Sequence, residues 1–164
     1  MSLPADLEAR PLEPSDMAAF TELSRVCDET YLEWAPRGWT VPVVPPGWAD
    51  RYLKPDAWVR VAFDAAGQLV ASVAFRPADV PEPVGHLGLL LVHPSRWREG
   101  IARTLLGRAE VEMRARGYVR EQLWTPLGAP AEQFYLAQGW ARDGRQEWHP
   151  WAGLEMVGYA KALA

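Results

Sequence analysis

The sequence contains few residues that cross-link a chain or bind a metal ion. Cys27 is its only cysteine, and its three histidines are scattered over 164 residues. A single cysteine cannot form an internal disulfide bond, and these residues offer no cluster of metal ligands. We therefore expect no metal site, and the reducing cytoplasm is the compartment that this cysteine usage favours.

Long apolar runs and an excess of positive charge are also missing. No apolar run approaches the roughly 18 residues of a membrane span, and the first residues lack the basic and then apolar pattern of a secretory signal. The net charge of -4 gives no electrostatic support for binding nucleic acid. We therefore expect a soluble cytoplasmic protein with neither a membrane nor a nucleic acid as partner.

The length and composition suit one domain that spans residues 1–164. Hydrophobic residues make up 49% of the chain, which is enough for a core, and no repeat or linker divides it. Composition and apolar pattern predict strands at residues 7–12, 58–63, 68–75, 87–92, 118–125, 140–148 and 154–163. Helical periodicity and capping residues predict helices at residues 17–31, 101–116 and 131–138, with a short helical segment at 48–54. The strand, helix and strand from 87 to 125 form a right-handed crossover, which makes those two strands parallel.

The turn before the central helix has the features of an anion site. The apolar run Leu87–Val92 is a buried strand, and the helix that follows begins near Ile101. Free N–H groups and the positive end of the helix dipole attract anions at such a point. Gly100 lets a ligand approach the backbone closely, and Arg98 and Arg103 lie where only a bound anion offsets their unfavourable interaction with the dipole. The alternative is a solvated basic turn before an ordinary surface helix.

Two segments resemble motifs of the GNAT superfamily of N-acetyltransferases. A strand that ends in Val92-His-Pro, followed by small residues at Gly100 and Ala102, resembles the acetyl-coenzyme A motif of this family. The segment 131–140, AEQFYLAQGW, resembles a second family motif. Trp97 stands where the family has Arg or Gln, and Gly128 stands where it often has Asn.

The resemblance implies the fold, the activity and the cofactor. The fold is an α/β (α+β) GNAT fold: a mixed, mostly antiparallel sheet of about six to seven strands, with a central parallel pair that splays after Val92, flanked by about four helices. The implied activity is acetyl transfer from acetyl-CoA to the primary amine of a small molecule by direct attack. A peptide N-terminus is an alternative acceptor, and a non-catalytic CoA-binding sensor or interaction module is an alternative function that Trp97 and Gly128 keep open. An unrelated nucleotide binder is a third alternative, and the resemblance also allows a homodimer.

The resemblance assigns cofactor contacts and catalytic roles. The implied cofactor-binding residues are Leu90, Leu91, Val92, Arg98, Glu99, Gly100, Ile101, Ala102, Arg103, Thr104 and Phe134. Tyr135 matches the family tyrosine and is the candidate acid that protonates the leaving thiolate, the alternative being an aromatic core residue. His86 lies fourteen residues before Gly100, where some GNAT enzymes have a catalytic glutamate, and is the candidate base unless it is merely structural.

The resemblance implies an acceptor pocket built from the loop after the first helix, the loop before the motif strand and the last hairpin. Aromatic faces beside carboxylates suit a cationic amine, and they suit an apolar amine as well. The candidate substrate-binding residues are Glu29, Glu33, Trp34, Trp39 and Trp148. The carboxylates of Glu29, Glu33, Asp79 and Glu82 are alternative bases that act through water. Trp34, Trp39, Trp48 and Tyr52 form either a lid over a ligand or a small satellite core that anchors the loop.

Overall fold

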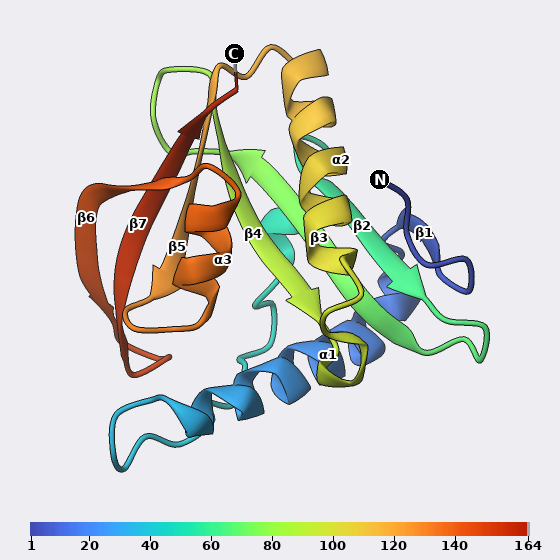
Figure 1. Ribbon diagram of the computed structural model, residues 1–164, viewed down its shortest axis with the longest axis horizontal. Helices are drawn as coiled ribbons and strands as arrows, with labels where there is room; N and C mark the ends of the chain where they lie inside the picture. Colours follow the sequence, from blue (N-terminus) through green and yellow to red (C-terminus); the bar gives the residue numbers. More distant parts are fainter. Residues whose placement is uncertain (164) are drawn as a thin grey trace.

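The computed structural model describes residues 1–163 as a seven-stranded sheet with helices on both faces (Figure 1). The strand order across the sheet is β1-β2-β3-β4-β5-β7-β6. The strands are β1 (Glu8–Pro11), β2 (Trp58–Phe63), β3 (Leu69–Pro77), β4 (Val84–Val92), β5 (Arg120–Pro126), β6 (Ala141–His149) and β7 (Leu154–Ala162). The helices are α1 (Met17–Glu29), α2 (Ile101–Ala115) and α3 (Ala131–Ala137). The predicted fold class is confirmed.

The structure has fewer helices than the sequence predicted. The segment at 48–54 forms only a single 3-10 turn, Asp50–Tyr52. Gly47 and Pro55 bound this stretch, and so few residues cannot offset the cost of helix nucleation. Trp48 nevertheless packs against Phe20, with 5.2 Å between ring centroids, so this tryptophan belongs to a satellite core as one alternative proposed.

The parallel pair β4 and β5 separates earlier than expected. Pairing runs only from Val84 opposite Arg120 to His86 opposite Gln122, and every other strand pair in residues 1–163 is antiparallel. The expected separation after Val92 is therefore wrong by six residues. The reason is an irregularity in β4, where Leu89 has φ of 53° and the register with β3 shifts. A bulge bends the strand that carries it, so β4 turns away from β5 (Figure 1).

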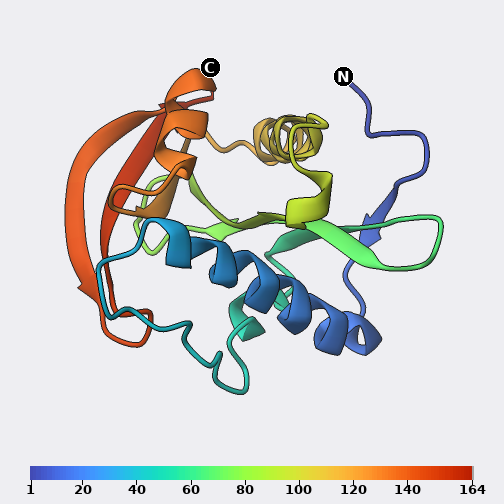
Figure 2. The ribbon, with the colours of Figure 1, turned by 60° about the horizontal axis from the view of Figure 1, so that its bottom comes forward.

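The helices cover the two faces of the sheet unequally. Figure 2 shows α2 and α3 on one face and α1 on the other. The apolar stripe of α2, which includes Ile101, Leu105 and Met113, is buried against the sheet as its periodicity predicted. The stripe Phe20 and Leu23 of α1 forms a smaller core on the opposite face. No helix in the described part of the chain is both long enough and apolar enough to span a membrane.

Candidate functional site

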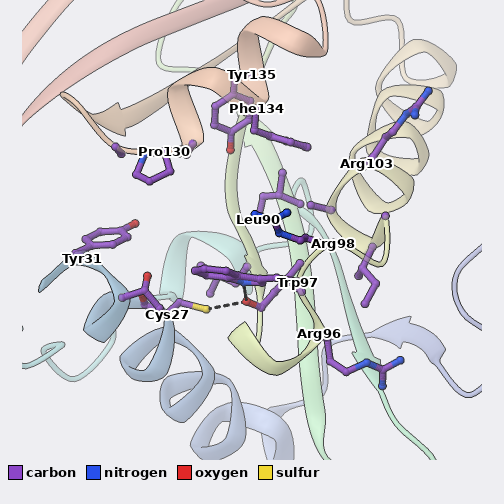
Figure 3. Close-up of a pocket in the computed structure, with 18 of the residues that line it drawn as sticks. Cys27, Tyr31, Leu90, Arg96, Trp97, Arg98, Arg103, Pro130, Phe134 and Tyr135 are labelled. Carbon is purple, nitrogen blue, oxygen red and sulfur yellow. Dashed lines mark hydrogen bonds between the residues drawn. The ribbon is translucent and has the colours of Figure 1, made fainter. Parts of the chain in front are cut away.

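A cavity of about 600 Å³ opens beside the last residues of β4, beyond the point where this strand stops pairing with β5. Its walls come from the end of α1, the last residues of β4, the turn that opens α2, and the start of α3 (Figure 3). Twelve residues predicted for the site line this cavity: Glu33, Trp34, Leu90, Leu91, Val92, Arg98, Gly100, Ile101, Ala102, Arg103, Phe134 and Tyr135. The sheet thus brings together segments that lie about 100 residues apart in the sequence.

The turn before α2 presents free backbone N–H groups at the edge of the cavity. Gly100 is the N-cap residue with φ of 77°, and no side chain caps the helix. The first intrahelical bond joins the Thr104 N–H to the Gly100 carbonyl at 3.0 Å, which leaves the amides of the preceding three residues without a helical acceptor. A Cβ atom at Gly100 would meet nothing within 4 Å, so the space beside this glycine is open to a ligand. This arrangement has the geometry expected of an anion site, and binding of an anion there stays a prediction.

The arginines of this region differ in whether they form ion pairs within the described residues. Arg98 and Arg103 line the cavity, and neither has a salt bridge to any residue in 1–163. Arg96 instead pairs with Asp6 at 2.9 Å and with Glu99 at 2.5 Å. Glu99 therefore faces an arginine and does not line the cavity, contrary to its predicted cofactor role.

Thr104 is also absent from the cavity lining. It lies one turn into α2, where it is buried at 5% exposure. Its predicted cofactor contact has no support from this position, because only the first residues of the helix reach the mouth of the cavity.

Trp97 ties the turn to the end of β4. Its indole N–H donates to the Val92 carbonyl at 2.8 Å, while its ring is half exposed and lines the cavity. The thiol of Cys27 approaches the same carbonyl at 3.5 Å. Burial raises the pKa of the Cys27 thiol to about 12, so it stays neutral beside the cavity. Trp97 therefore stabilises the shape of the turn, although it departs from the family motif.

Tyr135 has a buried ring and a hydroxyl without a hydrogen-bond partner in the described residues. The ring makes edge-to-face contacts with Phe134 and Trp140, at centroid distances of 5.3 and 5.7 Å. The hydroxyl points into the cavity (Figure 3) and has no hydrogen bond to residues 1–163. Burial raises the pKa of Tyr135 above its ordinary value, so the phenol remains protonated. The core packing thus holds the ring while the hydroxyl remains available.

A buried carboxylate supports the start of α3. Glu132 accepts hydrogen bonds from the Gly128 amide at 2.6 Å, from the Tyr159 hydroxyl at 2.6 Å and from Arg142 at 2.6 Å. Gly128 stands where the family often has Asn, and here its backbone is bound by the protein itself. The network fixes α3, which carries Phe134 and Tyr135, against β6 and β7.

The acceptor residues predicted from the sequence separate into two groups. Glu33 and Trp34 line the cavity, and their contact with an acceptor stays a prediction. Glu29 is instead exposed and forms an ion pair with Arg25, and Trp148 on β6 is 59% exposed outside the cavity. The structure therefore does not bring Glu29 and Trp148 into the cavity.

Trp39 has a bridging position outside the cavity lining. Its indole N–H donates to the Ala152 carbonyl at 2.8 Å, and its ring lies 6.0 Å from that of Tyr31. This bond joins the loop after α1 to the turn between β6 and β7, two segments 113 residues apart in sequence. Trp39 thus positions the loop, and contact with a ligand has no support from the cavity lining.

His86 lies on β4 but outside the cavity lining. Burial, followed by the charge of Arg76, lowers the pKa of His86 to about 4. The imidazole is therefore neutral at neutral pH, and a base of that pKa takes a proton from an ammonium group only weakly. The structure does not bring His86 together with Tyr135, and its role as a base stays a prediction.

Sequence reasoning missed several cavity-lining residues at the end of α1, in the 3-10 turn Thr30–Glu33 that follows it, and before α3. Cys27, Thr30 and Tyr31 line the cavity, as do Ala129 and Pro130 before α3. The inward-facing stripe of α1 continues at helical spacing from Cys27 to Tyr31, so extending that stripe would have identified the tyrosine. Within residues 1–163, no group of three or more metal-binding side chains is placed to hold a metal ion.

Comparisons with known proteins agree with this geometry. The fold is similar to that of a GNAT acetyltransferase from Staphylococcus aureus Mu50, with a TM-score of 0.76 and 15% identity over 96% of this chain and 99% of that one. It is also similar to the PaiA N-acetyltransferase from Thermoplasma acidophilum in complex with coenzyme A, with a TM-score of 0.70 and 19% identity over 99% of each chain. A third similar structure is the ribosomal-protein-S18-alanine N-acetyltransferase from Escherichia coli, with a TM-score of 0.70 and 17% identity over 96% of this chain and 94% of that one. No curated protein matches the sequence. A sequence model of the acetyltransferase (GNAT) family matches residues 19–140, and the chain therefore belongs to this family.

Proposed function

We propose that this protein is an acyltransferase that transfers the acetyl group of acetyl-CoA to the primary amine of a small molecule. The observation that carries the proposal is the uncapped turn at Gly100, whose free amides lie at the edge of a 600 Å³ cavity. Membership of the acetyltransferase family supports it, as does the similar structure from Thermoplasma acidophilum, which contains coenzyme A.

The residues of the cavity fit a CoA thioester. The amides of Ile101 and Ala102, with the free cations Arg98 and Arg103, suit the diphosphate. The open space beside Gly100 allows that close approach. When bound, acetyl-CoA supplies the activated acetyl group.

The separated strands can hold the extended arm of the cofactor. Beyond His86, the edge of β4 that faces β5 has no strand partner among the described residues. Unpaired N–H and C=O groups on a strand edge bind another extended chain, so the pantetheine arm can lie between β4 and β5. Leu90 lines the cavity here, directly after the bulge at Leu89.

The chemistry requires one proton to leave the amine and one to reach the thiolate. The amine nitrogen forms a bond to the acetyl carbon, the carbon–sulfur bond breaks, and the proton lost by the amine balances the one gained by CoA. Forming the free amine at pH 7 costs about 4 to 5 kcal/mol, given a pKa near 10.4. Glu33 is the carboxylate that lines the cavity and is our candidate for accepting this proton through water. Tyr135, protonated and directed into the cavity, is our candidate for donating the other.

A small acceptor suits the bridged loops better than a protein chain. The bond from Trp39 to the Ala152 carbonyl joins the loop after α1 to the last hairpin. This hydrogen bond holds the two loops together, and an extended peptide would need more open space between them than a small amine does. The similar structure from Escherichia coli is a ribosomal-protein-S18-alanine N-acetyltransferase, so peptides belong in the acceptor screen.

The experiment compares CoA binding by two glycine variants. Gly100→Glu places a bulky anion at the turn, while Gly67→Glu is the matched control, because Gly67 also has a positive φ (81°) and open space but lies in the β2–β3 turn. Losing two charge-assisted hydrogen bonds predicts at least about a hundredfold weaker binding for Gly100→Glu. Calorimetry should show unchanged affinity for the control. Equal affinities in both variants would contradict the proposed site.

Acetyl transfer is measured separately, as CoA release with a panel of small amines and peptides. The proposal requires that wild-type protein releases CoA with at least one small amine. Tight CoA binding without turnover on any amine would favour a CoA-binding module instead.

A further inference from the structure

The sheet face opposite α2 carries a group of polar and aromatic side chains that no α-helix covers. Gly85 faces α2, since a Cβ there would meet Met113, so the alternating pattern of the strand places His86 and Gly88 on the opposite face. Gln122 pairs with His86, which puts Gln122 and Trp124 of β5 on that same face. Residues of the two central strands are normally well covered, yet His86, Gln122 and Trp124 are only half-buried.

Cations surround this partly buried floor. Arg76 pairs with His86 across β3 and β4, and Arg145 lies over the Trp124 ring with its guanidinium carbon 4.5 Å from the centroid. The charges that act on His86 are those of Arg76, Arg145, Arg51 and a single acid, Asp79. We call Tyr52, Arg76, His86, Trp124 and Arg145 the basic patch. Arg145 is paired with Asp143 at 2.7 Å, whereas Arg76 has only the exposed Asp79 at 3.5 Å, so Arg76 is the cation of the patch that can attract an anion.

Only one of the three guanidinium nitrogens of Arg76 is hydrogen-bonded within the described residues. Its Nη1 donates to the Pro77 carbonyl at 3.0 Å and approaches Asp79 at 3.5 Å. Its Nε is buried without a hydrogen-bond partner, and its Nη2 donates to no residue in 1–163. The buried Nε is closed to solvent, whereas Nη2 is not among the buried atoms, so Nη2 is the donor that an acceptor from outside the chain can reach.

Tyr52 supplies a second donor at the same place. Its hydroxyl lies directly over Gly88, where an added Cβ would be only 2.1 Å away. Gly88 pairs with Ala74 of β3, two residues before Arg76, so the Tyr52 hydroxyl and Arg76 occupy neighbouring positions on the same face of the sheet. A planar guanidinium with a hydroxyl beside it matches the two oxygens of a carboxylate.

The basic patch borders the gap in which the cofactor is proposed to lie. Gly88 lies beneath the Tyr52 hydroxyl of the patch, and Leu90, two residues further along β4, lines the cavity. Two residues of a strand span about 7 Å, and Arg76 pairs with His86, two residues further from the gap. A carboxylate held between Arg76 and the Tyr52 hydroxyl is therefore about 7 to 13 Å along the strand from the gap, which one small molecule can bridge.

We propose that the acceptor is an amino acid or similar amine whose carboxylate is bound by Arg76 and the Tyr52 hydroxyl. This inference rests on the proposed acetyltransferase function and names the class of its acceptor. It also replaces the cationic amine expected from the sequence, because the side chains on this face are mainly basic.

The test uses pairs of amines that differ only in the carboxylate: L-phenylalanine with 2-phenylethylamine, L-leucine with 3-methylbutylamine, and L-methionine with 3-(methylthio)propylamine. Wild-type protein should show a kcat/KM at least about thirtyfold higher for the better amino acid than for its partner amine. Arg76→Gln should lower kcat/KM for that amino acid about tenfold to a hundredfold, the range of a charge-assisted hydrogen bond, and leave the partner amine within twofold. Tyr52→Phe should have a smaller effect of about three- to tenfold on the amino acid.

Two controls separate this proposal from others. Arg60→Gln is the matched variant, since Arg60 is also half-buried on a strand and stacks on Trp58, but belongs to β2 and lies outside the basic patch. This variant should leave kcat/KM unchanged for both the amino acid and its partner amine. Arg76→Lys keeps the charge without the planar fork and should give an intermediate loss. Thermal unfolding of each variant verifies that the fold persists.

Binding measurements keep the outcome decisive when turnover is low. Calorimetry with CoA-saturated protein should detect binding of at least one of the three amino acids, and Arg76→Gln should abolish it while CoA affinity stays unchanged. Preference for the partner amines, an amino-acid preference that survives Arg76→Gln, or no binding of any amino acid would overturn the proposal. Failure of CoA itself to bind would instead contradict the proposed function.

Discussion

Glu121 provides a test of the packing between β5 and α2. Its side chain is completely buried, and neither carboxylate oxygen has a hydrogen-bond partner among residues 1–163. Burial raises the pKa of Glu121 well above its ordinary value, and the charge of neighbouring Glu110 raises it further. Glu110 in turn forms ion pairs with Lys161 at 2.7 Å and Arg114 at 3.5 Å. Glu121 is therefore the protonated member of the pair.

This protonation makes stability fall as pH rises. Above the ordinary pKa of about 4.5 the unfolded chain releases the Glu121 proton, whereas the folded protein keeps it until pH exceeds the raised value. One proton corresponds to about 1.4 kcal/mol per pH unit, so wild-type protein should lose about 3 kcal/mol between pH 5 and pH 7 relative to Glu121→Gln. Glutamine has nearly the same shape and does not titrate, so the difference isolates this one group.

The assay is urea unfolding of both proteins at pH 5, 6, 7 and 8. The free-energy difference between them should change steadily in favour of Glu121→Gln until pH exceeds the raised pKa. Glu112→Gln is a suitable control, because Glu112 also lies on α2 but is partly exposed and pairs with Arg116. Its difference from wild type should vary little with pH. A pH-independent difference for Glu121→Gln would refute the assignment of a protonated carboxyl.

Three further outcomes are expected. Tyr135→Phe should lower kcat about a hundredfold or more while CoA affinity measured by calorimetry changes little, since only a general acid is removed; an unchanged kcat would exclude this role. Asp16→Asn should destabilise the fold by about 1.5 to 3 kcal/mol in urea unfolding, because Asp16 accepts two bonds from Arg10 and one from the Glu13 amide. The Arg10 bonds lower the pKa of Asp16, so this contribution should be present above pH 4 and disappear in more acidic solution, whereas a loss confined to high pH would contradict it. Burial raises the pKa of the Cys27 thiol to about 12, so Cys27 should react with iodoacetamide at pH 8 about a thousandfold more slowly than free cysteine. Mass spectrometry measures the rate of labelling, and rapid labelling would show that the thiol is not buried.

Local patterns in the sequence predicted most of the helices and strands, and the turn at Gly100 that opens α2. The spacing of Ile101, Leu105 and Met113 identified α2 and its buried face, because helical periodicity depends only on residues a few positions apart. Gly100 was predictable for the same reason, since a helix start with a glycine and no side-chain cap leaves its amides free whatever surrounds it. The order of strands and helices then followed from short-range connections and their handedness.

Only the tertiary structure decided where β4 and β5 separate and what faces the gap. The bulge at Leu89 results from how β4 pairs with β3, which no local pattern of apolar residues reveals. Packing of the loop after α1 likewise made Trp39 a bridge to Ala152. His86 and Arg76 meet on the face away from α2 because antiparallel pairing aligns residues that are ten apart in the chain. Contacts of this kind depend on the register of strands and on the packing of distant segments, and for that physical reason the sequence alone could not predict them.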